Sequence, residues 1–174
     1  MTKIWLSFYI EQPIFAAVKL AIIAIGKQDE PYIKEGVEMF TNRLQHYFTT
    51  EWKIITPLKN NAALDTKMLL AEEGKKLLKE IQPGDYVVLL DERGKQFSSV
   101  DLSVFIQKIS LASYKRIVFI IGGAFGVDTS VREKADFIWS LSRLVFPHML
   151  VRLILAEQLY RACTILKNEK YHHT

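Results

Sequence analysis

The residues best suited to binding a ligand lie in the last third of the chain, and the first group is a glycine cluster. Gly122, Gly123 and Gly126 follow directly after the apolar run 116–121, RIVFII. Glycine has no Cβ and tolerates positive φ, so a strand that ends in glycines lets the backbone approach a ligand closely. The spacing differs from G-x-G-x-x-G after a first strand, and no Gly-Lys pair is followed by Ser or Thr. The cluster predicts either another kind of ligand loop or a simple turn.

A second group of polar residues lies on one long apolar segment, 147–166. His148 and Arg152 are four residues apart, which places them on one face of a helix. The segment is apolar on nearly all sides, so it predicts a buried helix whose His and Arg need partners or a ligand. Arg152 and Glu157 are alternatively members of structural ion pairs, and Glu157 is also spaced for a surface pair with Arg161. For His148, the position at the helix start favours a role in a site.

The remaining reactive groups indicate neither thiol nor metal chemistry. Cys163, the only cysteine, lies on the same apolar helix, which predicts a buried and inert thiol. A single cysteine excludes a disulfide framework and indicates a reducing compartment. No Cys/His cluster has the spacing of zinc ligands, and the terminal pair His172-His173 lacks it too, so no metal is predicted.

Length, composition and charge restrict the class of protein. The chain has 174 residues, of which 49% are hydrophobic and 24% charged, and these values are typical of one soluble domain. Its net charge is +4, and residues 143–174, with five cations and two anions, carry +3 of it. Such a stretch is either a solvated face or a phosphate-binding surface. Glu11, Pro13 and Lys19 interrupt the apolar start, so we expect no membrane span, no secretory peptide and a cytoplasmic protein.

Strands and helices alternate along the chain. Short apolar runs predict strands at 18–25, 52–58, 86–90, 116–121 and 137–141. Helical spacing predicts helices at 31–48, 62–81, 99–113 and 147–166. A capping box of Ser130 and Glu133 predicts one further short helix. This order indicates one α/β domain with a parallel sheet covered by helices on both faces.

Five segments in a fixed order resemble one known family. They are LLDERG (89–94), FIIGGAFG (119–126), SLSRLVFPH (140–148), LVRLILAEQLYRA (150–162) and YHH (171–173). Together they closely resemble the RlmH family, ribosomal RNA large-subunit methyltransferases of the SPOUT superfamily. The resemblance covers a domain at 18–174 and leaves 1–17 as an extension of unknown role or a start site assigned too early. Ala124 and Phe125 stand where many members have a proline and an acidic residue.

The resemblance implies a fold, a cofactor and a reaction. The C-terminal segment would thread through a loop as a trefoil knot, a rare exception among folds. S-adenosylmethionine would bind in the knot, and no metal is implied. The substrate would be N3 of a pseudouridine in 23S rRNA within the ribosome, and the enzyme would be a homodimer with its site near the dimer interface. The implied cofactor-binding residues are Leu90, Gly122, Leu141, Ser142, Arg143, Leu144, Val145 and Phe146.

The implied reaction needs in-line positioning and loss of an imide proton, and it needs no thiol nucleophile. His148 is the candidate proton acceptor, because a histidine changes charge near neutral pH. Arg152 and Arg161 are candidates for holding phosphate or stabilising negative charge on the uracil ring. Tyr160, Tyr171 and His172 are candidates for stacking on, or hydrogen bonding to, a splayed-out base.

Two other functions remain as alternatives. A nucleotide-binding oxidoreductase is disfavoured because the glycines follow the fourth predicted strand rather than the first. A catalytically silent RNA- or ribosome-binding module with the same fold stays open because of the changes in the glycine loop.

Overall fold

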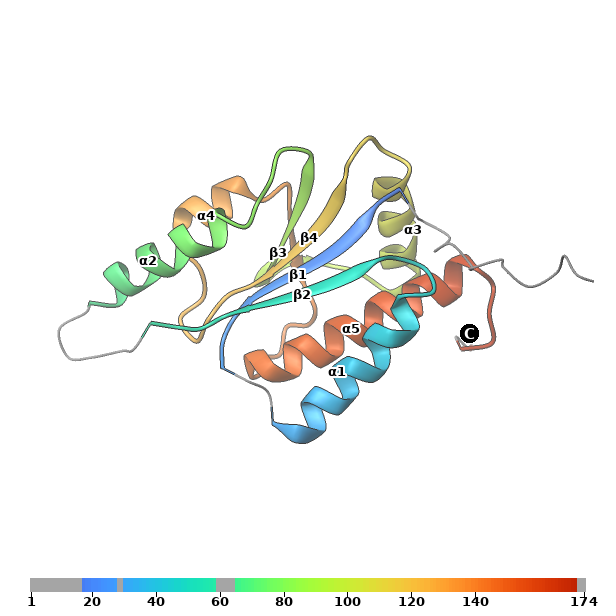
Figure 1. The fold of residues 1–174 in the computed structure, drawn as a ribbon, viewed down its shortest axis with the longest axis horizontal. Helices are drawn as coiled ribbons and strands as arrows, with labels where there is room; N and C mark the ends of the chain where they lie inside the picture. Colours follow the sequence, from blue (N-terminus) through green and yellow to red (C-terminus); the bar gives the residue numbers. More distant parts are fainter. Residues whose placement is uncertain (1–16, 28–29, 59–64, 172–174) are drawn as a thin grey trace, which may run out of the picture.

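Five parallel strands form the centre of the structure. The computed structural model describes residues 17–27, 30–58 and 65–171 (Figure 1). The strands are β1 (Lys19–Ile25), β2 (Thr50–Ile55), β3 (Asp85–Gln96), β4 (Arg116–Ile121) and β5 (Phe137–Ser140). They lie in the order β2-β1-β4-β3-β5, and every pair of neighbours is parallel. The predicted parallel sheet is confirmed, and all five strands end at the same edge.

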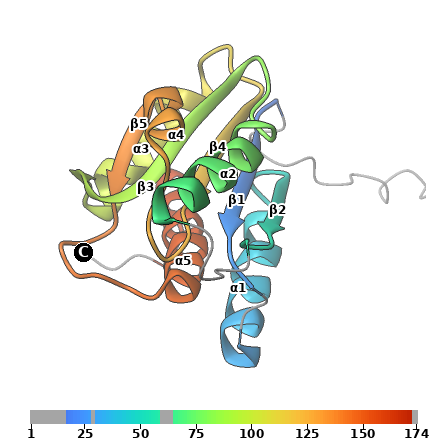
Figure 2. The ribbon, with the colours of Figure 1, turned by 90° about the vertical axis from the view of Figure 1, so that its left-hand side faces the viewer.

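Helices cover both faces of this sheet. They are α1 (Pro31–Leu44), α2 (Thr66–Leu78), α3 (Ser99–Ser110), α4 (Thr129–Lys134) and α5 (His148–Leu166). Helices α1, α3 and α5 lie on one face and α2 and α4 on the other (Figures 1 and 2). Side chains alternate along a strand, so Leu20 and Ile22 of β1 pack toward the first face, whereas Ala21 and Ile23 pack toward the second. No helix in the described ranges combines the length and apolarity that a membrane span needs. The trefoil knot stays a prediction.

The third strand is longer than its apolar run predicts. It continues through the polar residues 91–96, where its pairing with β5 shifts register between Leu90 and Lys95. Gly94 lies at this shift, and a Cβ on it would be 2.6 Å from the carbonyl oxygen of Ile138. The absence of a side chain at Gly94 therefore lets the two backbones pair closely. Tertiary pairing, rather than local hydrophobicity, extends this strand.

Several predicted element ends were wrong. α1 and α3 end at Leu44 and Ser110, before the predicted 48 and 113, and α2 ends at Leu78. The capping box of Ser130 and Glu133 is also wrong, because the cap of α4 is Asp128, whose side chain accepts a hydrogen bond from the Ser130 backbone N–H at 2.9 Å. An Asp at the N-cap accepts hydrogen bonds from the unpaired backbone N–H groups of the first helical turn, as a capping-box Ser would. The predicted extension 1–17 lies outside the described residues except for Ala17.

An ion pair joins the starts of the neighbouring strands β3 and β4, at the edge of the sheet away from the glycine loop. Arg116 at the start of β4 donates to both carboxylate oxygens of Asp85 at 2.8 and 2.6 Å, and to the carbonyl of Glu80 at 2.9 Å. The Asp85 side chain is 1% exposed and that of Arg116 is 13% exposed. Removing one member of such a pair leaves the other charge buried without its partner.

We therefore expect Arg116→Met to lower the free energy of unfolding by about 3 kcal/mol, because the Asp85 carboxylate would stay buried without the guanidinium that pairs with it. Urea denaturation followed by circular dichroism measures this change. Lys115→Met is the matched control, since Lys115 is the exposed neighbour and its loss should cost less than about 0.5 kcal/mol. Equal midpoints for the two variants would show that the ion pair contributes nothing.

Candidate functional site

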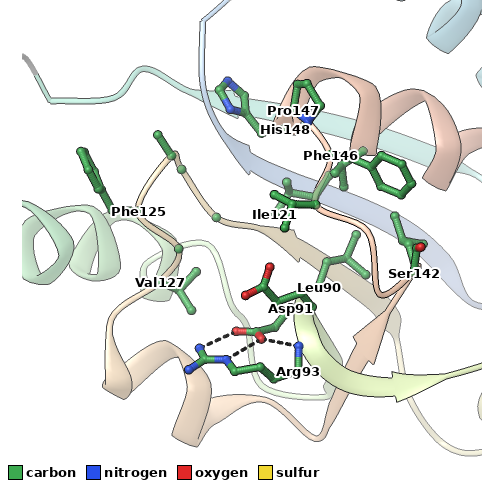
Figure 3. Close-up of a pocket in the computed structure, with 18 of the residues that line it drawn as sticks. Leu90, Asp91, Arg93, Ile121, Phe125, Val127, Ser142, Phe146, Pro147 and His148 are labelled. Carbon is green, nitrogen blue, oxygen red and sulfur yellow. Dashed lines mark hydrogen bonds and ion pairs between the residues drawn. The ribbon is translucent and has the colours of Figure 1, made fainter.

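A pocket of about 730 Å³ lies at the edge where the parallel strands end. This is the edge at which open parallel sheets bind ligands. Three stretches supply its walls: the end of β3, the glycine loop after β4, and the chain from the end of β5 into α5 (Figure 3). The lining residues are Leu90, Asp91, Glu92, Arg93, Ile121, Gly122, Gly123, Ala124, Phe125, Gly126, Val127, Trp139, Leu141, Ser142, Leu144, Val145, Phe146, Pro147, His148 and Val151.

The glycine loop forms one wall by folding back on itself. The Gly126 N–H donates to the Gly123 carbonyl at 3.1 Å, and the two residues form a β-bridge. A Cβ on Gly122 would lie 2.6 Å from the Gly126 carbonyl oxygen, so no larger residue fits there without moving the backbone. Gly126 itself has φ of +87°, a conformation that favours glycine. The loop is therefore a tight turn and also a pocket wall, so the two sequence alternatives do not exclude one another.

The opposite wall is the segment between β5 and α5. Its turn is held by two serines: the Ser140 hydroxyl donates to the Ser142 carbonyl at 2.8 Å, and the Ser142 hydroxyl accepts from the Leu144 N–H at 3.0 Å. Seven of the eight predicted cofactor-binding residues line the pocket, and Arg143 is the exception. The Arg143 side chain is exposed, between two residues of this wall. The structure thus brings segments about 20 to 50 residues apart to one cavity, as 90, 122 and 141 show.

His148 and Arg152 occupy different depths at the start of α5. His148 lines the pocket, whereas Arg152 is 0% exposed beneath it. The Arg152 guanidinium donates to the carbonyls of Lys27 at 3.0 Å and Ile25 at 3.5 Å. A Cβ on Gly26 would be 1.9 Å from Arg152 Nη2 and 3.5 Å from His148 Cδ2. Arg152 therefore fastens the end of β1 to α5, directly beside the residue that lines the pocket.

A charged cluster of Asp91, Arg93 and Arg132 lies beside the pocket at the end of β3, and the sequence did not predict it. Asp91 directly follows the buried part of β3 and accepts hydrogen bonds from Arg93 at 3.0 Å and from Arg132 of α4 at 2.5 Å (Figure 3 draws the Arg93 contacts). Hydrogen bonds from the Arg93 side chain, with those of its backbone and of Arg132, lower the pKa of Asp91 to about 2. The available signal was an acidic residue placed at the carboxyl end of a parallel strand.

The aromatic candidates lie at the other end of α5. Tyr160 is twelve residues after His148, which corresponds to roughly 18 Å along a helix. Its ring contacts that of Tyr171, with centroids 4.9 Å apart, and the Tyr171 hydroxyl donates to Glu157 at 3.1 Å. Burial and Glu157 raise the pKa of Tyr171. Within one chain these rings are not part of the pocket, and His172 lies outside the described residues.

Two structural predictions about α5 are confirmed. Glu157 and Arg161 form an ion pair at four-residue spacing, with side chains that are partly buried rather than fully exposed. Cys163 is buried, and desolvation raises the pKa of its thiol, so it stays protonated and unreactive near neutral pH. Among the described residues no group of three or more His, Cys, Asp and Glu side chains is arranged to hold a metal ion.

The Asp91 cluster predicts a pH-dependent contribution to stability. Because the folded pKa of Asp91 is lowered, its contribution is complete above the unfolded value near 4 and is lost as pH falls toward 2. Asp91→Asn should lower the free energy of unfolding by up to about 2 kcal/mol at pH 7, with solvent around Arg93 reducing this figure. Urea denaturation of both proteins at pH 7, 5 and 3 measures it. A difference that does not shrink at low pH would contradict this assignment.

Known proteins are similar to this chain over most of its length. The family model described as "Predicted SPOUT methyltransferase" matches residues 18–172. Proteins named "Ribosomal RNA large subunit methyltransferase H" are similar over nearly their whole length. The one from Parabacteroides distasonis is 44% identical over 90% of this chain and 99% of its own. Those from Christiangramia forsetii and Desulfitobacterium hafniense are 46% and 42% identical, over 88% and 89% of this chain and 98% and 99% of theirs.

A solved structure supports the fold independently. The probable methylase family protein from Haemophilus influenzae Rd KW20 superimposes with a TM-score of 0.50, over 89% of this chain and 70% of that one. Its sequence identity is 10%, so this likeness concerns the fold alone. The family match and the curated relatives carry the assignment further. The chain belongs to the SPOUT methyltransferases and, within them, to the RlmH family that its five sequence segments resemble.

Proposed function

We propose that this protein transfers a methyl group from S-adenosylmethionine to N3 of a pseudouridine in 23S rRNA of the large ribosomal subunit. It acts in the cytoplasm as a homodimer, with the knotted C-terminal part of the domain at 18–174 holding the cofactor. The observation that carries the proposal is the convergence of Leu90, Gly122 and the 141–146 segment on one pocket. The names of the curated relatives, which refer to a large-subunit rRNA methyltransferase, support the substrate class.

The pocket has the size and lining that the cofactor requires. Its volume of about 730 Å³ falls within the range of small-molecule sites. Leu90, Ile121 and Leu141 offer apolar surface for an adenine ring, while the backbone of the 142–146 segment offers polar groups. Gly126 has open space where a side chain would stand, so a ligand can approach the backbone of the glycine loop there.

The reaction requires no covalent protein intermediate. When bound, S-adenosylmethionine supplies an electrophilic methyl group on a sulfonium. The transfer would break the sulfonium S–CH₃ bond and the N3–H bond of the base and form an N3–CH₃ bond, leaving a neutral thioether and one proton. The protein must therefore accept that proton and hold N3 in line with the methyl carbon. His148 is the imidazole that lines the pocket, and we assign the proton to it. Asp91, paired with Arg93 and Arg132, is already committed to an ion pair.

Arg152 has a positioning role in this proposal. Its guanidinium is buried on the carbonyls of Ile25 and Lys27, where it sets the angle at which α5 presents His148. Tyr160, Tyr171 and His172 act on the RNA near the interface of the homodimer, together with Arg161. The Arg161 guanidinium, which pairs with Glu157, lies 4.8 Å from the centre of the Tyr171 ring and so stands beside this aromatic surface.

Calorimetry and rRNA analysis test the proposed function together. The protein should bind S-adenosylmethionine, and Gly122→Ala should bind it roughly tenfold or more weakly, because the new Cβ displaces the loop. Gly36→Ala is the control, because its Cβ would meet only the flexible end of the Leu153 side chain where α1 packs on α5. In a strain lacking this gene, the native gene should restore N3 methylation of the pseudouridine.

Each failure has a distinct meaning. Binding of the cofactor without methylation would refute the assigned substrate. No binding at all would support the catalytically silent RNA- or ribosome-binding module. Selective binding of a nicotinamide cofactor would overturn both and restore the oxidoreductase.

His148→Asn should lower kcat by about 100-fold or more and leave cofactor affinity unchanged, because it removes the proton acceptor but keeps a polar side chain. Wild-type kcat should rise with pH until the imidazole is neutral, and the variant should lose this rise. His46→Asn, an exposed histidine on the turn after α1, is the matched control. Unchanged kcat with intact cofactor binding would remove His148 as the acceptor.

A further inference from the structure

An exposed aromatic ring lies on the rim of the pocket, and nothing in the catalytic proposal uses it. Phe125 is 54% exposed although it lines the cavity, and Figure 3 shows its ring directed away from Leu90 and Ile121 on the floor. Across the pocket, Leu144 and Val145 are 69% and 80% exposed. The rim is therefore apolar on both sides of the opening.

The loop that carries Phe125 has little freedom to fold the ring away. Gly123 and Gly126 on either side of it are bridged by a hydrogen bond of 3.1 Å. The loop also has backbone contacts that exclude a side chain at Gly122, and Gly123 lies against the Glu73 carboxylate of α2 and Ile25 of β1. The backbone that carries Phe125 is thus held in place, so a partner that binds the ring does not have to order a mobile loop.

The charges around the rim favour a nucleic acid over an apolar protein surface. Lys27 is exposed and follows Gly26, which is packed against His148, and Arg143 is exposed beside Leu144. Arg93 is exposed on the third side, where it pairs with Asp91 at 3.0 Å and lies next to the exposed Glu92, so the unbalanced positive charge near the rim comes from Lys27 and Arg143. Aromatic surface interleaved with cations is how proteins hold single-stranded RNA, with bases stacked on rings and phosphates near Lys and Arg.

We propose that Phe125 stacks on a splayed-out base of the substrate RNA at the mouth of the pocket, and so determines how firmly the substrate strand is held there. This inference rests on the proposed function for the identity of the RNA. It assigns Phe125 to substrate binding only: the ring touches neither the cofactor's reacting atoms nor the proton. Stacking of a base on an aromatic ring contributes about 1–3 kcal/mol, or roughly 5- to 100-fold in affinity.

Substitutions that separate aromatic from apolar contact test the proposal. Phe125→Ala and Phe125→Leu should both weaken binding to ribosomes from the deletion strain by roughly 5- to 100-fold. They should lower kcat/KM for methylation of the same particles to a similar extent. Phe125→Trp, which keeps a stacking surface, should stay close to wild type. All three should bind S-adenosylmethionine as wild type does. Leu111→Ala is the matched control, because Leu111 is 79% exposed at the end of α3.

The competing outcomes are separable. Wild-type ribosome binding by Phe125→Leu would overturn the stacking proposal, and so would wild-type binding by Phe125→Ala. Phe125 could instead contact a second copy of the chain, and sedimentation analysis of each variant tests this. If Phe125→Ala dissociates an oligomer and regains ribosome binding at higher protein concentration, the proposal is wrong. Ribosome binding is measured separately from methylation. If the wild-type protein does not methylate the particles but the Phe125 variants still bind them more weakly, the role of Phe125 in RNA binding stands and the proposed reaction is refuted.

Discussion

The geometry of the pocket depends on one buried cation. Arg152 is fully buried under the start of α5, and its guanidinium donates hydrogen bonds to the backbone carbonyls of Ile25 and Lys27 at the end of β1. A guanidinium out of water is costly unless its donors are used, so the last helix and the first strand must meet in one relative position. Gly26 makes that approach feasible, because a side chain there would occupy the space of the guanidinium. His148, one turn earlier on the helix, takes its place from the same contact.

Close backbone approach is the second requirement, and glycine meets it at two places. At Gly94, β3 approaches β5 so closely that the strand pairing continues beyond the apolar run. At Gly122, the loop after β4 contacts its own return at Gly126. These two contacts hold the end of β3 and the glycine loop at the same cavity, where each forms part of its lining. The segment from Leu141 to Phe146 then closes the remaining side of the cavity.

Prediction from sequence succeeded where a local pattern determines structure. The runs at 18–25 and 116–121 are continuous and apolar, and they form β1 and β4 almost to the residue. The end of β3 was missed because 91–96 is polar and pairs only through a distant strand. The depth of Arg152 followed from its apolar helix, but its carbonyl partners are about 125 residues away in the chain, beyond any local pattern. Resemblance to a family, rather than periodicity, located the pocket residues, and no pattern in the chain indicated the link between Asp91 and Arg132.

The order of the strands also determines when the pocket can exist during synthesis. β3 and β4 are made before β5, yet the cavity is lined from residue 90 to residue 151, and its closing wall follows the last strand. Chains emerge from the ribosome amino end first. A nascent chain can assemble most of its sheet while α5 is still inside the exit tunnel, but Arg152 has not yet reached the carbonyls of β1. The pocket therefore cannot be complete before the start of α5 has left the tunnel, and a product that ended after β4 would lack the wall formed by residues 141–148.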